Sequence, residues 1–84
     1  MTSEQIIMYG TTWCPDCTRS KRWLESHKIP YTWCDIEKDT AAREYVVKAN
    51  HGRRSVPTIL FPDGSILVEP SDVELEEKIG SISK

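Results

Sequence analysis

The hydrophobic and polar positions along the first half of the chain predict a strand, a helix and a second strand. Residues 5–9 are apolar at odd and even positions alike, as expected for a strand covered on both faces. Between residues 14 and 28 apolar side chains recur at helical spacing, with Pro15 suited to the first turn and Pro30 ending the helix. Residues 31–36 form the second apolar run, and a helical crossover predicts that the two strands are parallel.

The second half of the chain predicts a helix followed by a hairpin. Asp39 or Thr40 can cap the helix, and Asn50 lies where it should stop. Two short apolar runs, residues 58–61 and 65–68, flank a Pro-Asp-Gly-Ser turn. This arrangement is typical of two antiparallel strands joined by a tight turn.

The last helix is expected to begin at a capping box formed by Ser71 and Glu74. The predicted order of elements is therefore β-α-β-α-β-β-α, an α/β fold with a four-stranded mixed sheet. Three helices are expected to flank the sheet and cover both of its faces. A chain of 84 residues has room for one domain, so we expect a single domain over residues 1–84.

Composition narrows the possible functions. The chain is 38% hydrophobic and 29% charged, with a net charge of −2, as in ordinary soluble globular proteins. Since no basic face stands out, we do not expect nucleic acid as a partner. The segment MTSEQIIMYG lacks the features of a secretory signal, and no apolar run is long enough to span a membrane. We therefore expect a cytoplasmic protein, in a compartment where thiols stay reduced.

Candidate chemistry lies in Cys14-Pro-Asp-Cys17, which follows a predicted loop at residues 10–13 and opens the first predicted helix. The free N–H groups and the dipole of a helix start stabilise a thiolate on Cys14, and the thiolate is the attacking species. Cys17 lies one turn further, where it can attack a mixed disulfide on Cys14. We expect Cys17 to be more buried and less ionised, and Cys14 to be open to solvent.

Two other roles for the cysteine pair fit less well. A zinc site normally needs four ligands, and the only additional candidates are Cys34, predicted within a strand, and the widely separated His27 and His51. A structural disulfide across so short a step would contribute little to stability. We therefore expect a redox dithiol with no metal and no tightly bound cofactor, and a Cys34 that is simply a small buried side chain.

Four segments occur together at a characteristic spacing. They are Trp13-Cys14-Pro15-Asp16-Cys17, Arg54-Ser55-Val56-Pro57-Thr58, Asp63-Gly64-Ser65 and Pro70-Ser71-Asp72. With these segments the chain resembles the glutaredoxins over nearly its whole length. Among them it is most similar to the actinobacterial mycoredoxins, with which it shares Asp-Ile-Glu at residues 35–37 and the motifs at residues 41–46 and 50–58. The resemblance implies a thioredoxin-like fold and a thiol–disulfide oxidoreductase.

The resemblance also implies a binding site for a low-molecular-weight thiol beside Cys14. Pro57 would be cis and face the Cys14 sulfur, and the Val56 backbone would pair with the cysteine portion of the bound thiol. Ser71 and Asp72, at a helix N-terminus, would hold its polar end. Trp13 could be a core residue, but beside the nucleophile we expect it to shield the sulfur and offer a surface to substrates.

The implied partners are proteins that carry a small thiol in mixed disulfide linkage, together with mycothiol or glutathione as co-substrate. Many glutaredoxins carry Lys where this chain has Thr11, and a Gly-Gly pair where it has Glu69-Pro70. Both departures touch the glutathione pocket and favour mycothiol. We expect a monomer. Two alternatives remain: a thioredoxin-like protein disulfide reductase recharged by a flavin reductase, and a non-enzymatic iron–sulfur cluster carrier.

Overall fold

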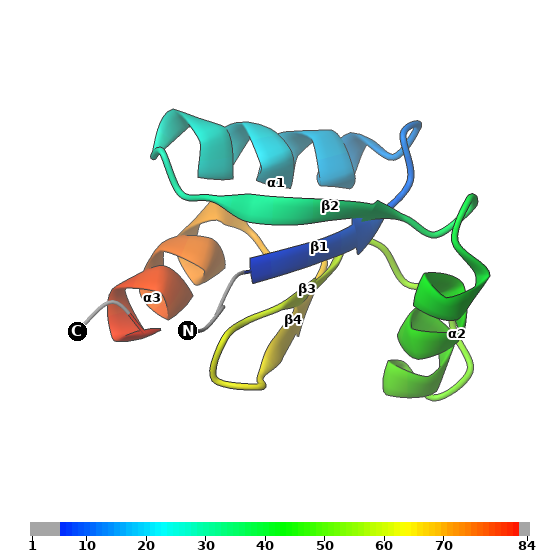
Figure 1. The fold of residues 1–84 in the computed structure, drawn as a ribbon. Coiled ribbons are helices and arrows are strands. Elements are labelled where there is room, and N and C mark those ends of the chain that lie inside the picture. Colours follow the sequence, from blue (N-terminus) through cyan, green and yellow to red (C-terminus); the bar gives the residue numbers. More distant parts are fainter. Residues whose placement is uncertain (1–5, 83–84) are drawn as a thin grey trace.

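The computed structural model describes residues 6–82 and contains the predicted elements in the predicted order (Figure 1). The elements are β1 (Ile6–Gly10), α1 (Pro15–Ser26), β2 (Tyr31–Asp35), α2 (Thr40–Ala49), β3 (Thr58–Leu60), β4 (Ile66–Val68) and α3 (Asp72–Ile82). Residue 5, which the pattern assigned to the first strand, lies outside the described residues. The order β-α-β-α-β-β-α is confirmed.

The four strands form one mixed sheet in the order β2-β1-β3-β4. Strand β1 runs parallel to β2, as a helical crossover requires, and antiparallel to β3, which pairs with β4 as the predicted hairpin. Since β1 and β3 run in opposite directions, the end of β1 and the start of β3 share one edge of the sheet, with Tyr9 opposite Thr58. The loop after β1 and the loop before β3 therefore meet there.

Helices cover both faces of the sheet, as predicted (Figure 1). Helices α1 and α3 pack on one face over the larger core cluster, which contains Ile6, Met8, Leu24, Ile59, Phe61 and Leu75. Helix α2 packs on the other face over a smaller cluster that contains Ile36, Ala42 and Val46. The alternation along β1 explains the division, because Met8 faces the first cluster and Tyr9 the second.

Side-chain caps define the starts of two helices. Asp39, and not Thr40, is the N-cap of α2, because its carboxylate accepts the Ala42 amide at 3.0 Å. The predicted capping box of α3 is confirmed. Ser71 Oγ accepts the Glu74 amide at 3.2 Å, and the Glu74 carboxylate accepts the Ser71 amide at 2.8 Å.

We expect the Asp39 cap to be a measurable part of the stability of α2. Asp39→Ala removes the only side-chain acceptor for the Ala42 amide and should lower the free energy of unfolding by about 1 kcal/mol. Asp39→Asn keeps an acceptor oxygen and should stay within a few tenths of a kcal/mol of the parent. Urea unfolding of the reduced protein measures both, and equal losses in the two variants would contradict the capping role.

Candidate active site

Cys14 occupies the N-cap position of α1, with an extended backbone at φ −84° and ψ 119°. Its carbonyl accepts the Thr18 amide at 3.1 Å and the Thr18 hydroxyl at 3.3 Å, so the helix begins directly after the cysteine. Pro15 follows at the start of the helix, where a missing N–H costs nothing. The Cys14 sulfur therefore lies at the end of the helix that favours negative charge.

The segment that precedes β3 covers the Cys14 sulfur. The Val56–Pro57 peptide bond is cis, as the resemblance implies, and the Cys14 thiol donates to the Val56 carbonyl over 3.8 Å. Cys14 is only 8% exposed, so it is more enclosed than the sequence predicts. The difference arises because the chain returns at Val56, whose carbonyl lies against the sulfur, and the sequence pattern does not show this contact.

The loop before β3 is held in place by a buried threonine. Thr58 Oγ1 donates to the Ser55 carbonyl at 2.7 Å and accepts from the Asn50 side chain at 3.1 Å. The Asn50 side-chain amide also donates to the Val46 carbonyl at 2.8 Å, which ties the loop to the end of α2. These bonds fix the position of the Val56 carbonyl relative to the helix start.

Cys17 lies one turn into α1 and is 1% exposed, so it is the more buried cysteine, as predicted. Burial is the main cause that raises the pKa of the Cys17 thiol, and contact with Cys14 and the nearby Asp16 carboxylate act in the same direction. The Thr11 amide opposes the shift, and the pKa is raised to about 12 by all these causes together. Cys17 is therefore a protonated thiol at neutral pH. Both cysteines are in the reduced form.

Gly10 is a site residue that the sequence analysis missed, because it was placed in a loop. It is the last residue of β1 and pairs with Asp35. A Cβ atom at Gly10 would lie 2.5 Å from the Cys17 sulfur and 2.9 Å from the Trp33 ring. The signal was available in principle, since a glycine within a strand often marks close approach of another group.

Trp13 lies on the surface and not in the core. It is 66% exposed, and its indole N–H donates to the Glu37 carboxylate at 3.0 Å. This bond joins the loop before α1 to the turn after β2. The structure thus rejects the core interpretation of Trp13 and leaves its ring available to a partner.

The start of α3 reaches the site through two contacts. The Glu69 amide donates to the Pro57 carbonyl at 2.9 Å, so the chain entering α3 lies beside the cis proline. Arg19 on α1 donates to the Pro70 carbonyl at 3.1 Å and forms ion pairs with Asp16 at 3.5 Å and Asp72 at 3.9 Å. Sequence reasoning did not single out Arg19, because its three partners meet only in the folded chain.

Ser71 and Asp72 are thus near Pro57 in space, although neither forms a hydrogen bond to a cysteine. Ser71 Oγ already accepts the Glu74 amide, so its hydroxyl proton is the group left for a ligand. Asp72 stays half exposed and only loosely paired with Arg19. Together the two residues offer a hydroxyl donor and a carboxylate acceptor at the start of a helix.

The remaining cysteine stands apart from the pair. Cys34 on β2 is partly buried against the core beneath α2, and burial raises its thiol pKa. Over residues 6–82 we find no cluster of three or more His, Cys, Asp or Glu residues placed to hold a metal ion. No helix in the same range is long and apolar enough to cross a bilayer.

Comparison with known proteins agrees with this geometry. A family model described as Glutaredoxin matches residues 6–66. A Mycobacterium tuberculosis protein named as a glutaredoxin is 41% identical over 83 residues, which cover 99% of each chain. Mycoredoxin 1 of Corynebacterium glutamicum is 32% identical over 80 residues, which cover 95% of this chain and 99% of the relative.

Solved structures show the same fold. The thioredoxin-like protein BC3987 matches with a TM-score of 0.76 at 27% identity, covering 87% of this chain and 97% of that one. A glutaredoxin from Archaeoglobus fulgidus matches with a TM-score of 0.73 at 24% identity, covering 90% and 86%. The thioredoxin-like, glutaredoxin-type fold implied by the sequence motifs is confirmed.

Gly10→Ala should damage the site through steric overlap. The new methyl group would overlap the Cys17 sulfur and the Trp33 ring, so we expect the free energy of unfolding to fall by about 1–3 kcal/mol. Gly80→Ala is the matched control, because nothing lies within 4 Å of the added Cβ. Within α3 it should leave stability unchanged or raise it by up to about 1 kcal/mol. Equal effects in urea unfolding would contradict the close approach at Gly10.

The protonated state of Cys17 can be measured directly in a Cys14→Ser, Cys34→Ala double variant, where Cys17 is the only thiol. Burial disfavours the anion, so the pKa moves upward from its ordinary value of about 8.5. Thiolate absorbance should therefore appear only above about pH 10 in the folded protein. In denaturant the midpoint should return to about 8.5, and a folded midpoint near that value would refute the assignment.

Proposed function

Because this chain belongs to the glutaredoxin family, whose members are thiol–disulfide oxidoreductases, we propose that it reduces mixed disulfides between proteins and a low-molecular-weight thiol. Cys14 is the proposed nucleophile and Cys17 the second thiol of the pair. The observation that carries the proposal is the Cys14 sulfur at the start of α1, in contact with the Val56 carbonyl.

The proposed first step is thiol–disulfide exchange at Cys14. Its thiolate attacks the small-thiol sulfur of the mixed disulfide, so that a bond forms between these two sulfurs and the bond to the protein sulfur breaks. The protein sulfur leaves as a thiolate and takes a proton from water. The protein substrate is then reduced, and Cys14 carries the small thiol as a new mixed disulfide.

The adduct on Cys14 can be resolved by two routes. A second small thiol can attack the adduct sulfur, which yields the small-thiol disulfide and frees Cys14. Alternatively, Cys17 attacks Cys14 and releases the small thiol, leaving an internal disulfide. A pKa of about 12 leaves only about one Cys17 in 10⁵ ionised at pH 7. This supports the route through a second small thiol.

The binding site for the small thiol is proposed to surround Cys14. While Cys14 is a thiol, its S–H occupies the Val56 carbonyl. Ionisation removes that donor, so the carbonyl becomes free to accept an N–H from the cysteine portion of the incoming thiol. Pro57 follows Val56 through the cis bond, and the exposed Trp13 ring offers a flat apolar surface next to Cys14. Ser71 and Asp72 offer a hydroxyl and a carboxylate for the polar end of the thiol.

The identity of the small thiol is proposed from two positions. Thr11, where many glutaredoxins carry Lys, is buried and places no cation at that point of the site. Glu69 adopts a positive φ of 50° where the family often has glycine, and it adds negative charge next to Pro57, whose carbonyl accepts the Glu69 amide. Both features disfavour an anionic thiol such as glutathione. They support mycothiol, as does the similarity to a mycoredoxin.

The proposed setting follows from the chemistry. One copy of the chain already brings Cys14, Cys17 and the Val56 carbonyl together, so a monomer is the proposed active unit, with a single domain over residues 1–84. Reduced small thiols are kept in supply in the cytoplasm, which is the proposed location. The small thiol is a co-substrate, and no tightly bound cofactor is needed.

A second candidate function is direct reduction of protein disulfides with electrons from a flavin reductase. The structural match to the thioredoxin-like protein BC3987 supports this second candidate. That reaction needs both cysteines, because the electrons leave as a Cys14–Cys17 disulfide. Turnover with thioredoxin reductase and NADPH distinguishes it from the main proposal.

Serine variants of the two cysteines test the main proposal. Cys14→Ser removes the nucleophile and should reduce turnover of a mixed disulfide by on the order of 10³-fold or more. Cys17→Ser should keep activity within about threefold, because a second small thiol resolves the adduct. The assay follows release of a peptide thiol from its mixed disulfides with mycothiol and with glutathione, in parallel.

Three outcomes would count against the assignment. Activity that survives Cys14→Ser would reverse the roles of the cysteines. Loss of activity in Cys17→Ser, together with turnover by thioredoxin reductase, would favour the second candidate. Faster reduction with glutathione than with mycothiol would overturn the choice of small thiol without affecting the reaction itself.

A further inference from the structure

Positive charge is concentrated in one segment of an otherwise acidic chain. Residues 43–54 contain four basic side chains, Arg43, Lys48, Arg53 and Arg54, and one acidic side chain, Glu44. The segment therefore carries a formal charge of +3, although the whole chain carries −2. The other residues together carry −5. Such separation of charge within a small domain produces a directional field around the molecule.

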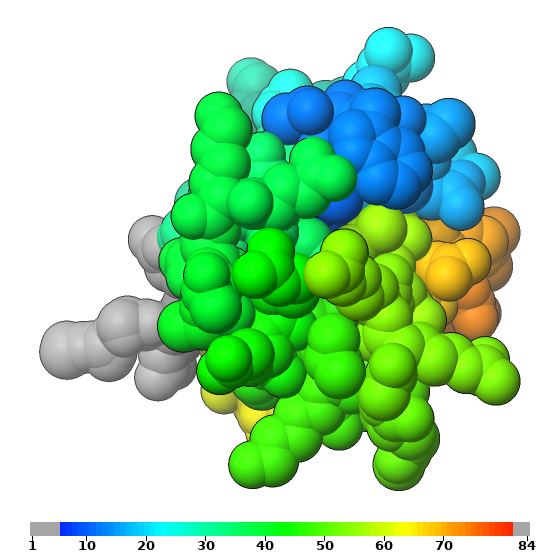
Figure 2. Space-filling view, turned by 90° about the vertical axis from the view of Figure 1, so that its right-hand side faces the viewer, coloured from blue at the N-terminus to red at the C-terminus, as the bar shows by residue number. Residues whose placement is uncertain are grey.

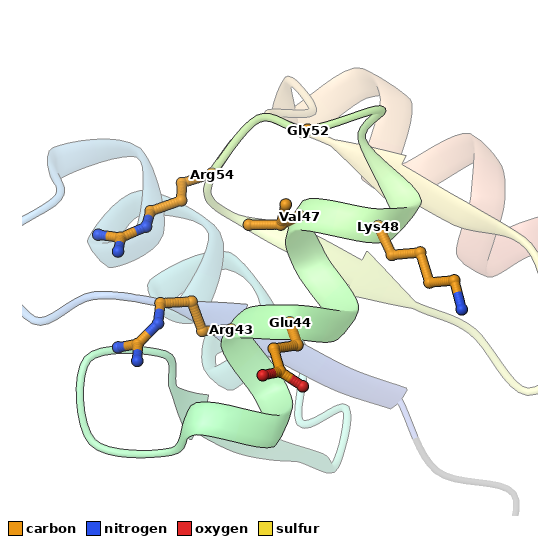
Figure 3. Close-up of a pocket in the computed structure, with 6 residues that line it drawn as sticks. All are labelled: Arg43, Glu44, Val47, Lys48, Gly52 and Arg54. Atoms are coloured by element: carbon orange, nitrogen blue, oxygen red, sulfur yellow. The ribbon is translucent and has the colours of Figure 1, made fainter.

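This segment folds into a pocket on the outer side of α2. The pocket, which we call the basic pocket, has a volume of about 480 Å³ and is lined by Arg43, Glu44, Val47, Lys48, Gly52 and Arg54 (Figure 3). Its loop side is fixed by the backbone, since the Gly52 amide donates to the Val47 carbonyl at 2.7 Å. Gly52 adopts a positive φ of 97°, a conformation that glycine accepts without strain. The hollow is thus part of the folded structure.

The basic pocket borders the active site. Arg54 precedes Val56 by two residues, so their Cα atoms lie within about 7.6 Å of each other. Arg43 donates to the carbonyl of Ile36, the residue that follows β2, at 3.2 Å. Figure 3 shows Arg43 and Arg54 extending in the same direction, and Figure 2 shows the segment before β3 directly below the loop after β1. Cation and reactive sulfur therefore share one end of the molecule.

The charges of the basic pocket are available to a partner. Within residues 6–82 neither Lys48 nor Arg54 forms a salt bridge, and both side chains are exposed. Val47 provides an apolar surface between them (Figure 3). A carboxylate-bearing chain could pair with the cations and bury apolar stems against Val47. Elsewhere the net negative charge of the protein would repel the same chain.

We propose that the basic pocket docks an acidic stretch of the protein substrate that flanks its disulfide-bonded cysteine. The inference rests on the proposed function, because docking here matters only if Cys14 reacts with protein disulfides. A substrate held at Arg54 presents its neighbouring residues to Val56 and Cys14. An acidic peptide fits better than nucleic acid, because one isolated pocket on an acidic protein offers no continuous basic track for a phosphate backbone.

The test compares two peptides that carry the same small thiol on one cysteine, with flanking residues that are either Glu or Gln. The parent protein should reduce the Glu peptide with a kcat/KM about tenfold higher at low salt, because charge complementarity accelerates association. Arg54→Glu should abolish this preference while leaving the Gln peptide within about twofold. Salt at about 0.5 M should also remove the preference, since it shortens the screening length.

Matched variants separate docking from general charge effects. Lys28→Glu makes the same change of charge beyond the far end of α1, and it should keep the preference for the Glu peptide. Lys48→Gln should reduce the preference partially. Glu44→Lys adds charge to the pocket and should raise kcat/KM for the Glu peptide by about threefold. Turnover of the peptide-free disulfide of the small thiol should be unchanged in all of them.

The results that overturn the proposal are distinct from those that overturn the proposed function. Equal reduction of the Glu and Gln peptides by the parent would remove the docking role and leave the reaction intact. Slower turnover of the peptide-free disulfide in Arg54→Glu would assign the pocket to the small thiol. Tight binding of an oligonucleotide that is lost in Arg54→Glu, with peptide rates unchanged, would assign it to nucleic acid.

Failure to reduce either peptide would refute the proposed function alone. Docking is then decided by fluorescence anisotropy of a labelled Glu peptide whose cysteine is blocked. Binding that weakens about tenfold in Arg54→Glu and persists in Lys28→Glu supports the basic pocket. Equal affinity for all three proteins rejects it.

Discussion

The contact between the Cys14 thiol and the Val56 carbonyl joins two segments that are 42 residues apart in sequence. It exists because β1 and β3 are antiparallel neighbours, which places the end of one and the beginning of the other at the same edge of the sheet. In the proposed reaction the helix start supplies the attacking sulfur, and the segment before β3 supplies the backbone carbonyl that pairs with the small thiol. Neither segment alone forms a site, so the topology of the sheet is what creates it.

The two cysteines show how environment separates identical side chains. Cys14 is the N-cap residue of α1 and bonds to the Val56 carbonyl, whereas Cys17 is packed on the backbone of Gly10 with almost no exposure. Burial disfavours the charged thiolate of Cys17 and is the main cause that raises the pKa of this thiol to about 12. The proposed roles of nucleophile and second thiol are therefore consistent with the different positions and burial of the two sulfurs.

The sequence predicts the elements well because their signals are local. Periodicity, Pro15, Asp39 and the Ser71–Glu74 box each report on a few neighbouring residues, and the structure confirms all of them. The features that the sequence did not predict depend on contacts between residues far apart in the fold. Gly10 was assigned to a loop, since its role depends on a sulfur seven positions later on another element.

Other parts of the site could not be predicted from the sequence either, because they too depend on contacts between distant segments. Arg19 bonds groups from two helices, and the enclosure of Cys14 depends on the chain returning at Val56. The resemblance to the glutaredoxins predicted the cis bond before Pro57, and the structure has it. Composition could not predict it, because most X-Pro bonds in folded proteins are trans. The basic pocket was missed because its cations are separated in sequence, and they gather only once the loop after α2 folds back on the helix.

In a domain of this size the site and the core share the same residues. Cys17, Pro57 and Thr58 are all fully buried, and the sheet divides the remaining core into two clusters. A chain of 84 residues has little surplus stability, so these side chains support the fold as well as the chemistry. The residues that can be substituted without loss of the fold are then those on the surface around Cys14. We call this surface the rim, and it contains Trp13, Ser71 and the basic pocket. We infer that the reaction is fixed by the core and that the choice of substrate is set by the rim.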